Sequence, residues 1–426
     1  MKDAYRLPVT TTSAAALTAY DRAVDSALGW KANALDLFRE ATAADPQLAV
    51  AHAGAAACLL LEERFDEARA ASEAARAAAA TSSVSDRERS YVEGVTLWTA
   101  GKLPEAERAM RSHLERWPTD LAIVQRLYFI FFWTGQFPAM LEATTALLPH
   151  HAQSSYMMGM HAFALEEAGR CDEAARLAER AVATNCGDAW SIHALAHALF
   201  ESGQFDRGIG ALPAAIAPCT GLNWFENHLW WHLALMHLSR GEYERVSTMS
   251  RERFEREPSS IAGNLHDSLS LLWRFELAGR PAGDRWTPLA AIARERINRT
   301  GLLFHVAHVA MALAGARDWA SAEQQAELLR KRAPKDPTGL MGDVTLPLVE
   351  GIHAFGAGDY ARTIAKIEPI RPRIVQLGGS RAQRDVFHDT LLEACFRAGD
   401  ADRAERLLTE RVARRADHFW TTRRSA

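Results

Sequence analysis

The sequence has no long hydrophobic run and few cysteines. Its longest run of bulky apolar residues, Leu127–Trp133, is far too short to span a bilayer. The first residues, MKDAYRLPVTTT, carry no apolar core of the kind found in signal peptides. The five cysteines are odd in number and form no CxxC pair, which is typical of a reduced compartment. We therefore expect a cytoplasmic protein without a membrane partner.

Charge of one sign is also lacking. The formal net charge is −4, and no stripe of lysine or arginine runs along the chain. A nucleic-acid-binding protein needs such a basic surface, and a helical-repeat reader of RNA also needs a base-reading pattern in each repeat. The sequence therefore predicts no nucleic-acid partner.

The familiar motifs of nucleophilic and nucleotide chemistry are absent as well. There is no GxSxG elbow, no phosphate-binding P-loop, no GxGxxG, and no cysteine next to a histidine. The sequence thus leaves an enzymatic activity open. If there is one, we expect it to depend on proton transfer by histidine.

What the sequence does contain is a glycine that returns at a fixed interval. Gly101, Gly135, Gly169 and Gly203 are each 34 residues apart, and each separates two helix-forming stretches. Glycine suits the end of a helix because it adopts a left-handed backbone without a steric penalty. Strand signals are scarce, and 34 residues is the period of a tetratricopeptide helical hairpin.

Further turns with looser spacing extend the pattern over most of the chain. They fall at Gly241, Gly279, Gly315, Gly358 and Gly399, with "EERFDEARA" at Glu62–Ala70 as an earlier unit. The sequence therefore predicts an all-α, right-handed tetratricopeptide superhelix of about ten hairpins. We expect an N-terminal extension and first helix over 1–29, one solenoid over 30–415, and a tail over 416–426.

Several phrases also resemble one protein family. They include "DAWSIHALAHALFESGQFDRGI", "HLWWHLALMHLSRGEYE", "FHVAHVAMALAGA" and "IVQLGGSRAQRDVF". Together they are similar to the tetratricopeptide repeat protein 38 family over roughly residues 30 to 415. The resemblance implies a tetratricopeptide architecture and carries no activity with it.

Histidine and tryptophan gather on one expected face of the central repeats. In tetratricopeptide hairpins, first-helix positions three and four residues apart share a face, and this face lines the concave groove. With each turn glycine as position 15, four successive repeats place polar and aromatic residues there. These residues are Trp190, His193, His197, His228, Trp231, His266, Trp273 and His305.

One interpretation of these histidines is structural, since a buried histidine usually bonds to a nearby carbonyl or carboxylate. Acid–base chemistry is a second interpretation, because histidine titrates near neutral pH. The candidate catalytic residues are His193, His197, His228, His232, Asp267 and His308. We expect no metal and no cofactor, because HxxxH alone is a weak signal, Ala194 replaces the zincin glutamate, and His232 is expected to point away from His228.

The phrase "LGGSRAQRDVF" has two interpretations. Ser380 and Gln383 fit a capping box that begins a helix, whereas the arginines and glycines fit an anion contact. Together with the groove residues, this gives a set of candidate ligand-binding positions. They are Trp190, Trp231, His266, Arg274, His305, Gln383, Arg384 and Asp385.

Two functions compete. The first is binding of a partner protein or peptide in a His/Trp-lined concave groove. The alternative is a small-molecule site, with or without histidine-based catalysis, in the same groove. An open groove would favour the first, and a capped cavity would favour the second.

Overall fold

The structure is a computed structural model that describes residues 1–81, 83–256, 258–415 and 417–425. Within these ranges it is all-α, with two isolated β-bridges and no strand. Helices α1 to α22 form eleven consecutive hairpins, and α23 follows them. None of the helices in the described ranges is both long and apolar enough to cross a bilayer.

The first seven hairpins are α1 (Ala14–Leu28) with α2 (Ala34–Ala44), α3 (Ala49–Leu61) with α4 (Phe65–Ala79), α5 (Asp86–Thr99) with α6 (Leu103–Arg116), α7 (Leu121–Trp133) with α8 (Phe137–Leu147), α9 (Ser155–Glu167) with α10 (Cys171–Thr184), α11 (Ala189–Glu201) with α12 (Phe205–Ile216), and α13 (Phe225–Ser239) with α14 (Tyr243–Met249). The last four are α15 (Ala262–Leu277) with α16 (Trp286–Arg296), α17 (Leu303–Gly315) with α18 (Trp319–Arg332), α19 (Leu346–Ala357) with α20 (Tyr360–Ile367), and α21 (Arg381–Ala398) with α22 (Ala401–Arg414). The final helix is α23 (His418–Ser425).

The predicted glycine turns are confirmed at the four regular positions, where φ lies between +67° and +81°. The predicted turn at Gly315 is wrong. Gly315 is the last residue of α17 and packs against the Trp286 ring, so close that a Cβ would lie 2.4 Å from it. Arg317 takes the left-handed conformation instead, with φ +55°. At the other end of α17, Leu302 is the N-cap residue and is exposed.

The helices at both ends of the chain pack against the helices next to them in sequence. Helix α1, within the expected N-terminal region, packs against α2 as the first hairpin. In the expected tail, positions 416 and 426 lie outside the described residues. The rest of the tail is largely α23, which packs on α22 and buries Trp420.

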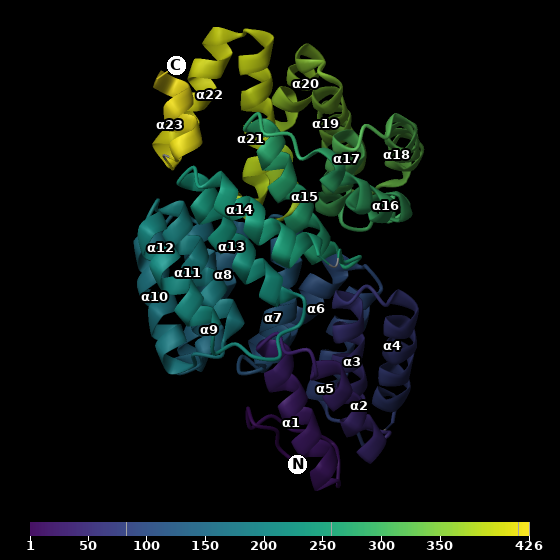
Figure 1. Ribbon diagram of the computed structural model, residues 1–426. Helices are drawn as coiled ribbons and strands as arrows, with labels where there is room; N and C mark the ends of the chain where they lie inside the picture. Colours follow the sequence, from purple (N-terminus) through teal and green to yellow (C-terminus); the bar gives the residue numbers. More distant parts are fainter. Residues whose placement is uncertain (82, 257, 416, 426) are drawn as a thin grey trace.

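The last hairpin folds back onto the central repeats, and Figure 1 shows α21 beside α15. Trp273 Nε1 of α15 donates a hydrogen bond to Thr390 Oγ1 at 2.9 Å, and Arg274 Nη2 donates to the Ala382 carbonyl at 2.8 Å. Helix α21 thereby covers the side of the superhelix on which the sequence predicted the concave groove.

Two consecutive glycines let the chain enter α21. Gly378 and Gly379 have φ of +82° and +75°. A Cβ on Gly378 would lie 2.7 Å from the Trp133 carbonyl oxygen, and one on Gly379 would lie 2.4 Å from the Phe304 ring. The "LGGS" phrase is therefore required by both backbone conformation and close approach.

The N-terminal half closes on the central repeats in a similar way. The backbone N–H of Asn223 donates to the Trp30 carbonyl at 2.9 Å, which joins the α1–α2 loop to the α12–α13 loop. Farther along, Arg296 pairs with Glu63 at 2.7 Å. These contacts link segments that lie about 200 residues apart in sequence and enclose the central helices.

We predict that Gly378→Ala destabilises the protein more than Gly101→Ala. Both glycines have positive φ, but a Cβ on Gly101 meets nothing within 4 Å. Gly101→Ala should therefore cost only the left-handed penalty of about 1–2 kcal/mol. Gly378→Ala adds a clash with backbone atoms. Urea unfolding of both variants measures the difference, and equal losses would contradict the docking of this segment.

Candidate functional site

Four neighbouring first helices bring the central histidines together. Helices α11, α13 and α17 each contribute two histidines, and α15 contributes one histidine with its neighbouring aspartate. All of these side chains are buried. They are His193, His197, His228, His232, His266, Asp267, His305 and His308.

His228 occupies the centre of this cluster. Its Nδ1 lies 2.9 Å from Asp267 Oδ2, and its Nε2 lies 3.1 Å from His193 Nε2. His232 Nε2 is also close, 3.2 Å from the same His228 Nε2. The expectation that His232 points away from His228 is therefore wrong, because one helical turn of α13 places both rings on the same side.

His197 completes a group of four. One nitrogen from each of His193, His197, His228 and His232 lies within 4.8 Å of the others. His197 Nδ1 is 3.3 Å from Glu166 Oε2, although the two atoms are not aligned for a hydrogen bond. Among the described residues, both oxygens of Glu166 and both ring nitrogens of His197 have no hydrogen-bond partner.

A second chain of contacts runs beside the first. His266 Nδ1 lies 3.1 Å from His305 Nδ1, and Gln383 Nε2 lies 3.0 Å from His266 Nε2. Gln383 also forms the predicted capping box with Ser380, which is confirmed. His308 faces inward on α17 but bonds through Nδ1 to the Phe304 carbonyl at 2.9 Å.

Burial determines the charge of this cluster. It lowers the pKa of His193 and His232 well below the usual value, and neighbouring histidines add to the effect. It also lowers the pKa of His197 to about 3. Burial alone would raise the pKa of Asp267, but His228 and His266 lower it to about 2. At neutral pH these three imidazoles are therefore neutral, so each keeps a lone pair that can accept a hydrogen bond or bind a cation, and the carboxylate is ionised.

A small aromatic pocket opens onto three of these histidines. The space between its walls, mouth included, is about 490 Å³. Its polar lining is His193, His228, His266 and Gln383, and its apolar lining is Trp30, Leu61, Phe129, Phe132, Trp133, Trp190, Trp224 and Phe225. Of the predicted site residues, Trp190 thus lies at the pocket with the histidines.

Trp30 forms one wall of this pocket and was missed by the sequence analysis. Its ring stacks on Phe225 with centroids 4.3 Å apart and on Trp190 at 5.6 Å. Its φ is +58°, a costly backbone conformation for a large side chain. Because Trp30 lies in a loop outside the 34-residue register, the sequence carries no signal for its position.

A neighbouring pocket contains a second residue that was missed, Arg126. This pocket shares Trp30, Leu61, Phe129 and Trp224 with the aromatic pocket. Arg126 is 3% exposed and has no ion-pair partner among the described residues, and its Nε has no hydrogen-bond partner there. Arg126 and His232 both occupy position 6 of their repeats. A polar residue at this position was therefore the sequence signal that could have identified both as site residues.

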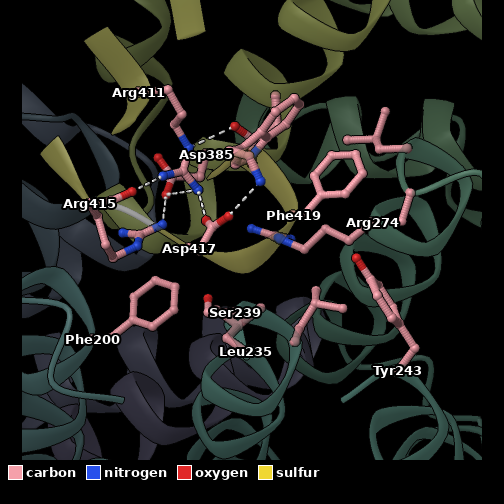
Figure 2. Close-up of a pocket in the computed structure, with 15 residues that line it drawn as sticks. Phe200, Leu235, Ser239, Tyr243, Arg274, Asp385, Arg411, Arg415, Asp417 and Phe419 are labelled. Carbon is pink, nitrogen blue, oxygen red and sulfur yellow. Dashed lines mark hydrogen bonds and ion pairs between the residues drawn. The ribbon is translucent and has the colours of Figure 1, made fainter. Parts of the chain in front are cut away.

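Three other predicted site residues lie in contacts between helices. Arg384 pairs with Glu167 at 3.0 Å, and Arg274 binds the Ala382 carbonyl. Asp385 pairs with Arg414 and Arg415, and Figure 2 shows it between Arg411 and Arg415 at a pocket that also includes Phe200 and Tyr243.

The remaining predicted residue of the ligand set, Trp231, is fully buried. Its ring stacks on His228 with centroids 5.3 Å apart, and the Arg274 guanidinium lies 5.7 Å from the ring centroid. Trp231 therefore supports the central histidine from behind and does not line the aromatic pocket.

Comparisons with known proteins give the following likenesses. No family model matches the chain. A structure of Naa15/Naa10 bound to HypK-THB matches with 13% identity and a TM-score of 0.27, over 94% of this chain and 63% of that one. The crystal structure of the P58(IPK) TPR domain matches with 12% identity and a TM-score of 0.24, over 91% of this chain and 89% of that one.

The class of the protein follows from its own helices. Consecutive antiparallel hairpins, glycine turns at a 34-residue period and packing between successive first helices define an all-α tetratricopeptide solenoid. In this solenoid α21 and the α1–α2 loop cover the concave side of the central repeats. An aromatic pocket lined by three of the central histidines lies there.

We predict that Arg384→Met reduces the free energy of unfolding by about 3–5 kcal/mol, because it leaves Glu167 buried without its cation. Arg207→Met removes an exposed pair with Glu179 and should leave stability nearly unchanged. Urea unfolding compares the two variants. An Arg384→Met variant as stable as Arg207→Met would argue against α21 docking through this ion pair.

Proposed function

We propose that this protein binds a small molecule in the aromatic pocket at the centre of the solenoid. The carrying observation is that the chain's own segments cover the concave side beside this pocket, whose polar lining is His193, His228, His266 and Gln383. Ligand pockets are typically apolar and aromatic with a few convergent polar groups. This pocket has that composition.

The covering segments favour a small molecule over an extended peptide. A peptide in a tetratricopeptide groove needs an open channel along several first helices. Here Arg381 and Arg384 of α21 bind Glu167 at the end of α9, and Arg415 binds Glu201 at the end of α11. A peptide could enter this face only after these buried ion pairs had separated.

The neighbouring Arg126 favours a ligand with an anionic group. Nη1 of Arg126 donates to the Ala122 carbonyl at 2.9 Å and to Gln125 Oε1 at 3.2 Å, but the buried guanidinium has no carboxylate partner among the described residues. An incoming carboxylate would bind its Nε and Nη2 in two parallel hydrogen bonds. The adjoining aromatic walls would hold a flat apolar body between Trp30, Phe129 and Trp224. We therefore infer that the ligand class is an aromatic or apolar carboxylate.

Binding of a protein partner is the second candidate, and one observation favours it. Trp319 is 42% exposed at a surface cleft that Phe355, Tyr360 and Arg397 also line. Exposed tryptophan beside arginine is common at the centre of protein interfaces. The likeness to the tetratricopeptide repeat protein 38 family is compatible with both candidates and assigns neither.

The proposal is tested with 2-naphthoate and its uncharged analogue 2-naphthamide. We predict that the protein binds the carboxylate at least about tenfold more tightly, because one charge-assisted hydrogen-bond pair to Arg126 is worth about 1.5–3 kcal/mol. Arg126→Met should remove this preference. Isothermal titration calorimetry measures both affinities.

The matched control is Arg111→Met, which removes an arginine of α6 that pairs with Glu107 outside the pocket. It should retain the preference. Arg126→Met should also raise the free energy of unfolding of the ligand-free protein by about 1 kcal/mol, since it replaces a buried cation that has no carboxylate partner among the described residues. Three outcomes would contradict the proposal. The protein could bind both probes with equal affinity, it could bind neither probe, or the Arg126→Met variant could bind 2-naphthoate as tightly as the wild type does.

A further inference from the structure

We infer that His193, His197, His228 and His232 form a binding site for one divalent transition-metal ion, with zinc as the best match. Four imidazoles from two neighbouring helices, α11 and α13, approach one point with their ring nitrogens within 4.8 Å of one another. Each helix supplies an HxxxH pair, in which residues four apart lie on one face. Each HxxxH pair alone is a weak signal for a metal site, but the fold brings the two pairs together.

The tautomer of His228 limits how many hydrogen bonds its Nε2 can form with the neighbouring histidine nitrogens. When its Nδ1–H donates to Asp267, its Nε2 carries a single lone pair, which accepts one hydrogen bond. Two ring nitrogens nevertheless lie against it, from His193 at 3.1 Å and from His232 at 3.2 Å. A cation among the three nitrogens satisfies all of them at once.

The distances also suit a metal. Zinc binds histidine nitrogen at about 2.0–2.1 Å in a tetrahedron, whose edges are then about 3.3 Å long. The two measured nitrogen–nitrogen distances at His228 are close to that edge length. Imidazole ligands favour zinc, copper, iron and nickel, and four imidazoles with edges of this length would suit the tetrahedral coordination of zinc best.

Carboxylates lie behind two of the four rings. Asp267 accepts from Nδ1 of His228, and Glu166 faces Nδ1 of His197 at 3.3 Å, which leaves Nε2 of each ring for the metal. Such carboxylate–histidine pairs orient metal-binding rings in proteins. In the described part of the chain Glu166 is fully buried and pairs with no arginine or lysine. A nearby divalent cation would stabilise the ionised form of this carboxylate.

Metal and ligand would meet at the aromatic pocket. His193 and His228 line that pocket, whereas His197 and His232 lie behind them. Because four imidazoles fill the tetrahedral positions of zinc, a bound ligand would lie against the metal-binding rings of His193 and His228 and not on the ion itself. This role toward a ligand rests on the proposed function, while the existence of the metal site does not.

The test uses untagged protein stripped of metal and titrated with Co²⁺, which absorbs visibly in a tetrahedral nitrogen site. We expect one Co²⁺ per chain, displaced by one Zn²⁺, and a higher melting temperature with either ion. His232→Leu should weaken Co²⁺ binding at least about 100-fold, and Asp267→Asn about 10- to 100-fold. The matched control is His237→Leu, a buried histidine on the same helix that contacts Glu242 instead, and it should bind as wild type does.

Failure to bind Co²⁺ and Zn²⁺ at one equivalent would overturn the inference, as would equal affinities of the His232→Leu and His237→Leu variants. His197→Leu provides a second ligand variant if His232→Leu does not fold, as judged by circular dichroism. Calorimetry with 2-naphthoate on the metal-stripped protein separates the two proposals. Binding of naphthoate without metal binding would overturn the metal site alone, and metal binding without naphthoate would overturn the ligand site alone.

Discussion

Helix α21 is held on the central repeats by charges that it buries. Arg384 lies 3.0 Å from Glu167 at the end of α9, and Arg415 lies 2.6 Å from Glu201 at the end of α11. All four side chains are buried, so separating either pair would leave a charge without water or a partner. The pocket depends on this docking, because α21 supplies Gln383 to its lining.

Below the pocket the core departs from ordinary apolar packing. Buried imidazoles and carboxylates normally find hydrogen-bond partners, yet several atoms around His197, Glu166 and Arg126 have none among the described residues. Trp30 adds a backbone conformation that a tryptophan rarely adopts. Arg126, His197 and Trp30 lie on α7, on α11 and in the α1–α2 loop, at or next to the aromatic pocket, as is common where residues are arranged for binding.

The architecture was predictable from the sequence because the 34-residue glycine spacing and helical periodicity are local signals. The gathering of His193, His228 and His266 was predictable for the same reason, and the capping box at Ser380 is confirmed. Where spacing became irregular, prediction failed, as at Gly315, whose turn is made by Arg317. The roles of Trp30 and α21 depend on contacts between distant segments, which no local pattern carries.

The most direct test is an anomalous diffraction map, collected at the zinc absorption edge, from crystals of zinc-loaded protein. The account predicts one strong peak on the pocket side of α13, about 2.0–2.1 Å from a ring nitrogen of each of His193, His197, His228 and His232. The docked α21 should cover the same site. No peak among these rings, or zinc bound only at surface residues, would contradict the account.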